Sequence, residues 1–229
     1  MKIKQVSSTH PFKGNVDFNK LNTLVSDVGA DKIPYVCIAT CVNMAGGQPI
    51  SLGNLRDLRS WCDQHNISLV RDMTRVAENA YFIQQREDGY QTKTVKEIVY
   101  EICELTDAAT MSSKKYAMVN IGGFLAMNDD RLYEKACALV VVYEGLHTYG
   151  GMAGRDMEAL AIGIKESVQD THMQARVGQI EYLGEQLIAA GVPIDGHAVF
   201  LDARAILPHI PQEQCPAQAL AAALYVESG

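Results

Sequence analysis

The first half of the chain alternates between runs of β-forming apolar residues and stretches with helical spacing. Residues 33–42 form a continuous β-rich run, which is typical of a strand buried on both faces. Ser51 is a favourable helix N-cap, and apolar residues recur at helical spacing through 51–65. Residues 67–70 then predict a second strand that ends at Asp72. Strand, helix and strand at this spacing predict a parallel βαβ unit.

The same patterns predict the remaining elements. Helices are expected at 21–28, 94–105, 128–143, 155–190 and 217–226, and strands at 108–111, 122–127 and 197–202. The helix at 94–105 begins with Thr94 and has Glu97 three residues later, which is the form of a capping box. We therefore expect an α/β fold with a mostly parallel sheet flanked by helices. It is divided into a large domain at 1–190 and part of a small domain at 191–229.

Several polar side chains follow directly after predicted strands. In parallel α/β sheets, ligands bind just beyond the carboxyl ends of the strands. A right-handed crossover places Asn43 and Asp72 at the same edge of the sheet. The end of the 108–111 strand brings Ser112, Lys114 and Lys115 to that edge as well. The sequence therefore predicts a site at this edge.

Composition and charge exclude several classes of binding partner. The chain of 229 residues is 48% hydrophobic and has a formal net charge of −7, with a sequence pI near 5.3. Because no basic face is visible, we expect no nucleic-acid partner. The apolar run near 138–142 is far too short to cross a bilayer, so we expect a soluble cytoplasmic protein that does not enter a membrane. The six cysteines lie mostly in apolar segments and form no Cys-x-x-Cys pair, which favours reduced core thiols over a zinc site.

The adjacent lysines indicate covalent chemistry at the predicted edge. A second ammonium beside Lys115 disfavours the charged form of its amine by like-charge repulsion, which favours Schiff-base formation. A lysine and an aspartate at neighbouring strand ends are the two groups that a pyridoxal 5′-phosphate enzyme needs most, because Asp72 keeps the pyridine nitrogen protonated. Taken singly, the lysine pair is equally consistent with a solvated basic turn, and Asp72 with an ordinary loop acid or helix cap.

Four further polar residues fit the same cofactor. Asn43 is placed to donate a hydrogen bond to the phenolic oxygen of the ring, and Arg75 is placed to reach the same oxygen. Ser112 and Lys114 are the expected phosphate ligands. A surface ion pair is the alternative for Arg75.

Several segments resemble the β-eliminating lyase family, whose branches are the tyrosine phenol-lyases and the tryptophanases. The matching segments are 43–49, 72–83, 111–115, 119–124, 149–158 and 216–220. The resemblance implies the aspartate-aminotransferase-like architecture (fold type I of pyridoxal phosphate enzymes) and a homotetramer with sites at dimer interfaces. It implies that Lys115 is the Schiff-base lysine, that Asp72 is the pyridine partner and that Asn43 and Arg75 contact the ring oxygen. It also implies phosphate contacts for Ser112 and Lys114, and a potassium ion bound by the backbone carbonyl of Asn120.

The resemblance implies β-elimination on an aromatic amino acid, with Lys115 as the base at Cα. Residues 72–75 and 140–145 resemble the phenol-lyases, whereas 11–15 and 207–211 are more similar to the tryptophanases. We favour tyrosine, which gives phenol, pyruvate and ammonia. The alternative substrate is tryptophan, which gives indole in place of phenol.

The chain also departs from the family. It is shorter at both ends, so we expect either a middle fragment or a naturally shortened relative. Tyr116 stands where the family usually has aspartate. Two other functions therefore stay open, a catalytically inactive scaffold and an aminotransferase of the same fold. The products formed from tyrosine and tryptophan distinguish these functions.

Overall fold

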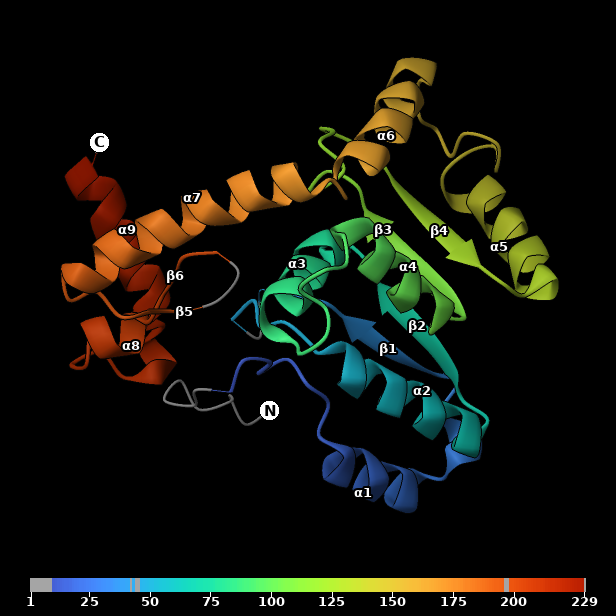
Figure 1. Ribbon diagram of the computed structural model, residues 1–229, viewed down its shortest axis with the longest axis horizontal. Helices are drawn as coiled ribbons and strands as arrows, with labels where there is room; N and C mark the ends of the chain where they lie inside the picture. The colour runs from blue at the N-terminus through green and yellow to red at the C-terminus, as the bar shows by residue number, and fades with distance from the viewer. Residues whose placement is uncertain (1–9, 42, 44–45, 196–197, 229) are drawn as a thin grey trace.

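The computed structural model describes residues 10–41, 43, 46–195 and 198–228. Its centre is a four-stranded sheet of order β1-β2-β3-β4 (Figure 1). The strands are β1 (Tyr35–Ala39), β2 (Ser68–Asp72), β3 (Ala108–Ser112) and β4 (Gly123–Met127). The first three strands are parallel, as predicted, and β4 runs antiparallel to β3.

Helices α2 and α4 cover one face of this sheet. Its main core joins apolar side chains of both helices to Ala109 and Met111 of β3. The helices before the second lobe are α1 (Phe18–Val28), α2 (Leu52–His65), α3 (Val76–Arg86), α4 (Val95–Glu104), α5 (Asp130–Tyr143), α6 (Gly154–Glu166) and α7 (Asp170–Ala189), with a 3-10 turn at Ala30–Lys32.

Both predicted helix caps are present. The Ser51 hydroxyl accepts a hydrogen bond from the amide of Asn54 at 3.1 Å and so begins α2. At the start of α4, Thr94 and Glu97 exchange side-chain and backbone hydrogen bonds, which confirms the capping box. These caps satisfy amide groups that a first helical turn otherwise leaves unpaired.

The expectation that β1 is buried on both faces is wrong. Tyr35 is 53% exposed and Cys37 is also exposed, because their side chains lie on the face of the sheet opposite α2 and α4, whereas Ile38 on the other face packs against the main core. Alternation along the strands places Cys37, Thr110 and Leu125 on the face opposite α2 and α4, which we name the open face; all three are exposed.

The expectation of mostly buried cysteines is also wrong. Only Cys41 and Cys62 are buried among the six free thiols. Cys103 follows the buried residue Ile102 on α4, and at helical spacing a neighbour of a core residue can face outward. An apolar stretch of sequence therefore does not by itself bury each cysteine within it.

The long helix expected at 155–190 is two helices. The break lies at 167–169, between α6 and α7. Ser167 turns its hydroxyl back to the carbonyl of Ile164 at 2.9 Å, and Val168 packs against the main core. A serine that bonds to the backbone of its own turn competes with helical hydrogen bonding, which helps to explain the break. The end of α7 is as predicted, with Gly191 at φ +79° just beyond it.

The elements after α7 form a second lobe. In Figure 1, α7 extends from the main sheet to this lobe. The lobe contains β5 (Ile194–Asp195), β6 (Phe200–Leu201), α8 (Ala203–Ile206), a 3-10 turn at Gln212–Gln214 and α9 (Pro216–Ser228). The strand expected at 197–202 is therefore reduced to β6, which pairs antiparallel with β5; residue 197 lies outside the described residues. The division into domains at residue 190 stays a prediction.

Buried charged side chains are usually hydrogen bonded or ion paired, and Arg71 in the sheet is an exception among the described residues. Arg71 of β2 is fully buried, and none of its three guanidinium nitrogens has a hydrogen-bond partner among the described residues. It lies in register with Ile38 and Ala109. Burial lowers the pKa of Arg71 to about 10, so the side chain is still charged at neutral pH. A buried cation without a partner destabilises the folded state.

We therefore expect Arg71→Met to stabilise the chain. Methionine keeps much of the volume and removes the unpaired donors, so the free energy of unfolding should rise by about 1–2 kcal/mol at pH 7. The gain should shrink as the pH rises through about 10, where Arg71 of the folded protein loses its charge. Urea unfolding measures it, with Arg131→Met on the exposed side of α5 as a control expected to change stability by less than about 0.5 kcal/mol. A loss of stability in Arg71→Met contradicts the assignment of an unpaired charge.

Candidate functional site

The carboxyl ends of β1, β2 and β3 meet at one edge of the sheet (Figure 1). Asp72 lies in register with Ala39 on one side and with Thr110 on the other. The backbone carbonyl of Asp72 accepts a hydrogen bond from the Thr40 hydroxyl at 3.4 Å, and the amide of Met73 donates to the carbonyl of Thr110 at 2.7 Å. The predicted convergence of strand ends is therefore present.

A chain of hydrogen bonds connects the predicted aspartate to the predicted lysine. The Asp72 carboxylate accepts from the amide of Thr74 at 2.9 Å. The Thr74 hydroxyl in turn accepts from the amide of Ser112 at 3.0 Å, and Lys115 Nζ donates to the Ser112 hydroxyl at 2.7 Å. Alternation along β2 and β3 places Asp72 and Ser112 on the open face. Three of the predicted site residues thus belong to one connected group.

Lys115 is carried by a tight turn at 113–117, which we name the lysine turn. Lys114 and Lys115 are exposed, whereas Tyr116 and Ala117 are buried. The amide of Ala117 donates to the carbonyl of Ser113 at 3.1 Å and closes the turn. Helix α6 lies directly behind it, because a Cβ built on Gly163 falls 1.7 Å from the Ala117 carbonyl oxygen. Only glycine permits this approach.

Arg75 begins α3 at the same edge. It is half-buried and adopts φ −126° and ψ 34° as the N-cap residue of the helix. Burial raises the pKa of the Cys41 thiol, and the nearby positive charge of Arg75 partly opposes that rise. Arg75 therefore lies near the loop that follows β1.

Asn43 lies in that loop and is exposed, with its backbone carbonyl accepting from the amide of Gly46 at 2.9 Å. The loop is fixed to α3 by Asn79, whose side-chain amide exchanges two hydrogen bonds of 2.9 Å with the backbone of Ile50. Contact between the Asn43 side chain and a ligand beside Asp72 stays a prediction.

Asn120 lies in the bend between the lysine turn and β4 and is exposed. Two residues later, the carbonyl of Gly122 accepts from the amide of Ser113 at 3.1 Å. Because β4 runs antiparallel to β3, the bend that precedes β4 lies near the end of β3, at the site edge. The predicted role of the Asn120 carbonyl as a potassium ligand stays a prediction.

Sequence reasoning missed the residues that connect the site. Thr74 has a recognisable local signal, because an aspartate two residues before it forms an Asx turn. Glu78 and Arg176 form an ion pair of 3.2 Å across 98 residues of sequence, and no local pattern reveals such a contact.

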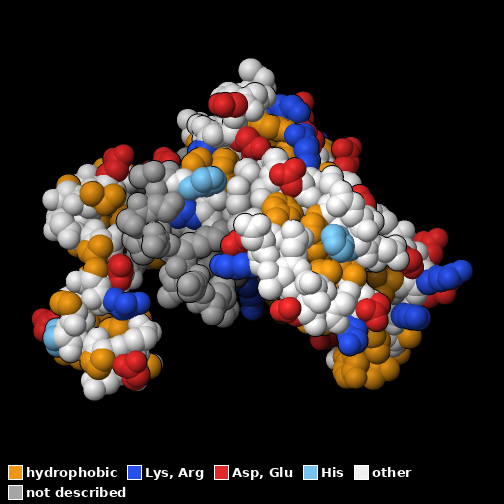
Figure 2. Space-filling model, turned by 90° about the horizontal axis from the view of Figure 1, so that it is seen from below, with side chains coloured by type: hydrophobic (Ala, Val, Ile, Leu, Met, Phe, Trp, Pro, Cys, Tyr) orange, Lys and Arg blue, Asp and Glu red, His pale blue; other side chains and the backbone are white. Residues whose placement is uncertain are grey.

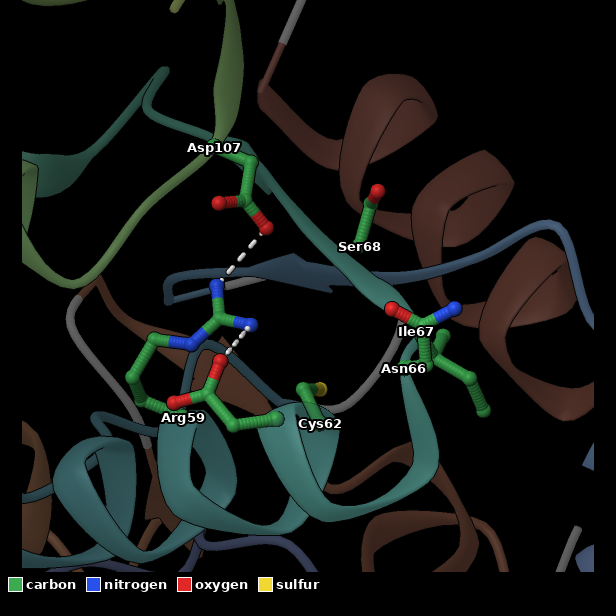
Figure 3. Close-up of a pocket in the computed structure, with 7 residues that line it drawn as sticks. Arg59, Cys62, Asn66, Ile67, Ser68 and Asp107 are labelled. Carbon is green, nitrogen blue, oxygen red and sulfur yellow. Dashed lines mark hydrogen bonds and ion pairs between the residues drawn. The ribbon is translucent and has the colours of Figure 1, made fainter.

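A pocket of about 270 Å³ lies at the opposite edge of the sheet, where β2 begins (Figure 3). Arg59 crosses it and forms ion pairs of 2.7 Å with Asp63 and with Asp107. The Asp107 carboxylate also accepts from the amide of Leu69 at 2.7 Å. These ion pairs join α2 to the residue before β3, so we interpret the pocket as a structural clamp.

The surface is mixed in charge. On the face in Figure 2, lysine and arginine side chains are interspersed with aspartate and glutamate. Across the described ranges, no helix has both the length and the apolar character needed to span a membrane.

Comparisons with known proteins agree with the sequence resemblance. The tyrosine phenol-lyase of Symbiobacterium thermophilum is 60% identical over 226 residues, covering 97% of this chain and 49% of the relative. That of Nostoc punctiforme is 59% identical, covering 97% of this chain and 48% of the relative. The chain thus spans about half the length of the curated relatives it matches.

A solved structure confirms the fold class. The threonine aldolase of Leishmania major superposes with a TM-score of 0.59 at 17% identity, covering 80% of this chain and 51% of that one. The predicted aspartate-aminotransferase-like architecture, fold type I of pyridoxal phosphate enzymes, is thereby confirmed. The family model described as "Beta-eliminating lyase" matches residues 1–226. The chain therefore belongs to the β-eliminating lyase family.

Proposed function

We propose that this chain provides the lysine-bearing part of a pyridoxal phosphate-dependent carbon–carbon lyase that acts on an aromatic amino acid. The observation that supports this most directly is the hydrogen-bonded path from Asp72 through Thr74 and Ser112 to Lys115. Family membership adds to it. The path joins a carboxylate and an amine, the two groups that the cofactor requires, at the edge where ligands bind in such sheets.

The residues at this edge fit the chemistry of the cofactor. When bound, pyridoxal phosphate supplies an aldehyde that links to an amine and a ring that accepts the electrons of a broken bond. Lys115 is exposed and Asp72 is half-buried, so the amine is accessible while the carboxylate is partly shielded. Ser112 and Lys114 offer a hydroxyl and an ammonium for a phosphate.

Each residue then has a distinct task. Asp72 would keep the pyridine nitrogen of the cofactor protonated, and Asn43 and Arg75 would donate to its ring oxygen. Lys115 would hold the cofactor through its amine, and the same amine would accept the Cα proton of the substrate. The fixed Ser112 hydroxyl orients the Lys115 amine in the resting protein.

We propose tyrosine as the substrate because the two relatives are tyrosine phenol-lyases at 59–60% identity. Tyrosine and water then give phenol, pyruvate and ammonia. Tryptophan, with indole as the product, is the alternative from the sequence. We further propose a potassium ion at the Asn120 carbonyl, a homo-oligomer and a cytoplasmic location. Comparison of cofactor uptake in potassium and in sodium tests the cation site.

Borohydride fixation followed by peptide mapping tests the proposed function. The chain is incubated with pyridoxal phosphate and reduced, and the modified residue is identified by mass spectrometry. We expect the reduced cofactor on Lys115. The unreduced protein is then supplied with tyrosine or tryptophan, and phenol, indole and pyruvate are measured. An adduct on Lys115 without any product favours the inactive scaffold, a keto acid without free phenol or indole favours an aminotransferase, and the absence of a specific adduct refutes cofactor binding by this chain.

A further inference from the structure

Three side chains from three separate elements meet behind the lysine turn. Glu78 comes from the first turn of α3, Tyr116 from the lysine turn and Arg176 from α7. Arg176 Nε lies 3.2 Å from the Glu78 carboxylate, and Arg176 Nη2 lies 3.4 Å from the Tyr116 hydroxyl. The guanidinium also stacks over the Tyr116 ring, 4.7 Å from its centroid. We name this group the anchor cluster.

The anchor cluster is buried enough for its pairing to matter. Glu78 is fully buried and Tyr116 is 3% exposed, whereas the Arg176 side chain is 42% exposed. A buried carboxylate is costly unless it is paired, and Arg176 supplies the opposite charge. Burial raises the pKa of Tyr116, and the nearby negative charge of Glu78 raises it further. The Tyr116 phenol is therefore neutral at neutral pH and faces the Arg176 cation.

Its place in the chain ties the cluster to the proposed site. Tyr116 follows Lys115 directly, and Glu78 lies three residues after Arg75 on α3. Within the lysine turn, the Tyr116 side chain points into the protein while the Lys115 amine reaches outward to Ser112. Fixing one of two neighbouring side chains in a tight turn restricts the direction of the other. The cluster thus holds the turn from the side opposite the amine.

We propose that Arg176 is a positioning residue, which through Glu78 and Tyr116 fixes the direction in which Lys115 presents its amine. This inference rests on the proposed function, because it assigns Arg176 a part in presenting Lys115 to the cofactor. It also gives α7 a role, since that helix connects the lysine turn to the second lobe (Figure 1). A shift of α7 then reaches Lys115 by way of the Arg176 guanidinium and the Tyr116 side chain.

The first test uses the protein without cofactor. Arg176→Met removes the charge and the stacking cation, so hydrogen exchange at the Ala117 amide, which closes the turn, is expected to accelerate roughly 10-fold or more. Tyr116→Phe keeps the ring and loses only the hydroxyl, so a smaller acceleration is expected. Arg131→Met on α5 is the matched control and should leave exchange in the turn unchanged.

The second test measures whether the Lys115 amine is still directed toward the cofactor, rather than the stability of the lysine turn. Borohydride fixation of pyridoxal phosphate in Arg176→Met is expected to lower the ratio of Lys115 to Lys114 adduct about 10-fold from that of the wild type. Arg176→Lys restores the charge without the planar fork and should recover part of the ratio. If Arg176→Met does not fold, Tyr116→Phe and Arg176→Lys provide the same comparison.

The outcomes separate the two proposals. An unmodified Lys115 in the wild type overturns the proposed function, and the exchange measurement then still tests whether Arg176 anchors the turn. A specific wild-type adduct whose ratio and exchange rate stay unchanged in Arg176→Met and Tyr116→Phe overturns the positioning role. Faster exchange with an unchanged adduct ratio also overturns it, because Arg176 then contributes to stability alone.

Discussion

Replacing Lys115 by alanine is expected to abolish the specific borohydride-fixed adduct of pyridoxal phosphate at every cofactor concentration. Only a primary amine at this position can form the covalent link and accept the Cα proton, and alanine offers neither. The Ser112 hydroxyl also loses its 2.7 Å contact with the amine. Turnover of tyrosine is therefore expected to fall below detection in the same variant.

The neighbouring lysine provides a matched control. Lys114→Ala removes another exposed ammonium one residue away and leaves the predicted Schiff-base amine in place. As a phosphate ligand, Lys114 should affect affinity rather than attachment, so the cofactor concentration for half-maximal adduct should rise roughly 10-fold. Cofactor titration with peptide mapping measures both effects. An adduct lost in Lys114→Ala and retained in Lys115→Ala assigns the covalent role to the other lysine.

Gly163→Ala is expected to give the largest loss of stability among single-methyl insertions at this site. The added Cβ falls 1.7 Å from the carbonyl oxygen and 2.7 Å from the carbonyl carbon of Ala117. Both are backbone atoms of the lysine turn, so no side chain can rotate away and either α6 or the turn must shift. Overpacking of this kind costs about 3 kcal/mol. Urea unfolding measures the loss, and the displaced turn should also lower the yield of Lys115 adduct.

Gly178→Ala is the matched control for this variant. Gly178 lies within α7, and a Cβ built there meets no atom within 4 Å. Alanine has the higher helix propensity, so this variant should gain about 0.5–1 kcal/mol. Equal effects of the two substitutions contradict the close approach of α6 to the lysine turn.

The parts of the fold that local patterns determine could be predicted from the sequence. The caps at Ser51 and Thr94 depend on residues three positions away, and both are present. The ends of β2 and β3 are local features too, and two strand ends place Asp72 and Ser112 at one edge once the crossover is right-handed. For this reason the core of the candidate site could be located before its geometry was known.

The features that were missed depend on tertiary position. Residues 33–42 have the apolar composition of a strand buried on both faces, yet Tyr35 and Cys37 of β1 are exposed on the open face. Composition does not state whether other elements cover both faces of a strand. The break at 167–169 has no glycine or proline signal; there Ser167 bonds back to the carbonyl of Ile164 and Val168 packs against the main core. The ion pair of Glu78 with Arg176 has no local signature at all.

The spacing of the contacts around Lys115 has a consequence for the order of assembly. The bond from Lys115 to Ser112 spans three residues, whereas the ion pair that secures the lysine turn spans 98. By the logarithmic growth of loop-closure entropy, the longer loop costs roughly 3 kcal/mol more to close. The Lys115 amine is thus expected to reach the Ser112 hydroxyl early, during local collapse. Its direction is fixed only later, when α7 docks and Arg176 pairs with Glu78. We therefore expect the site to mature late in folding, when the Glu78–Arg176 ion pair forms.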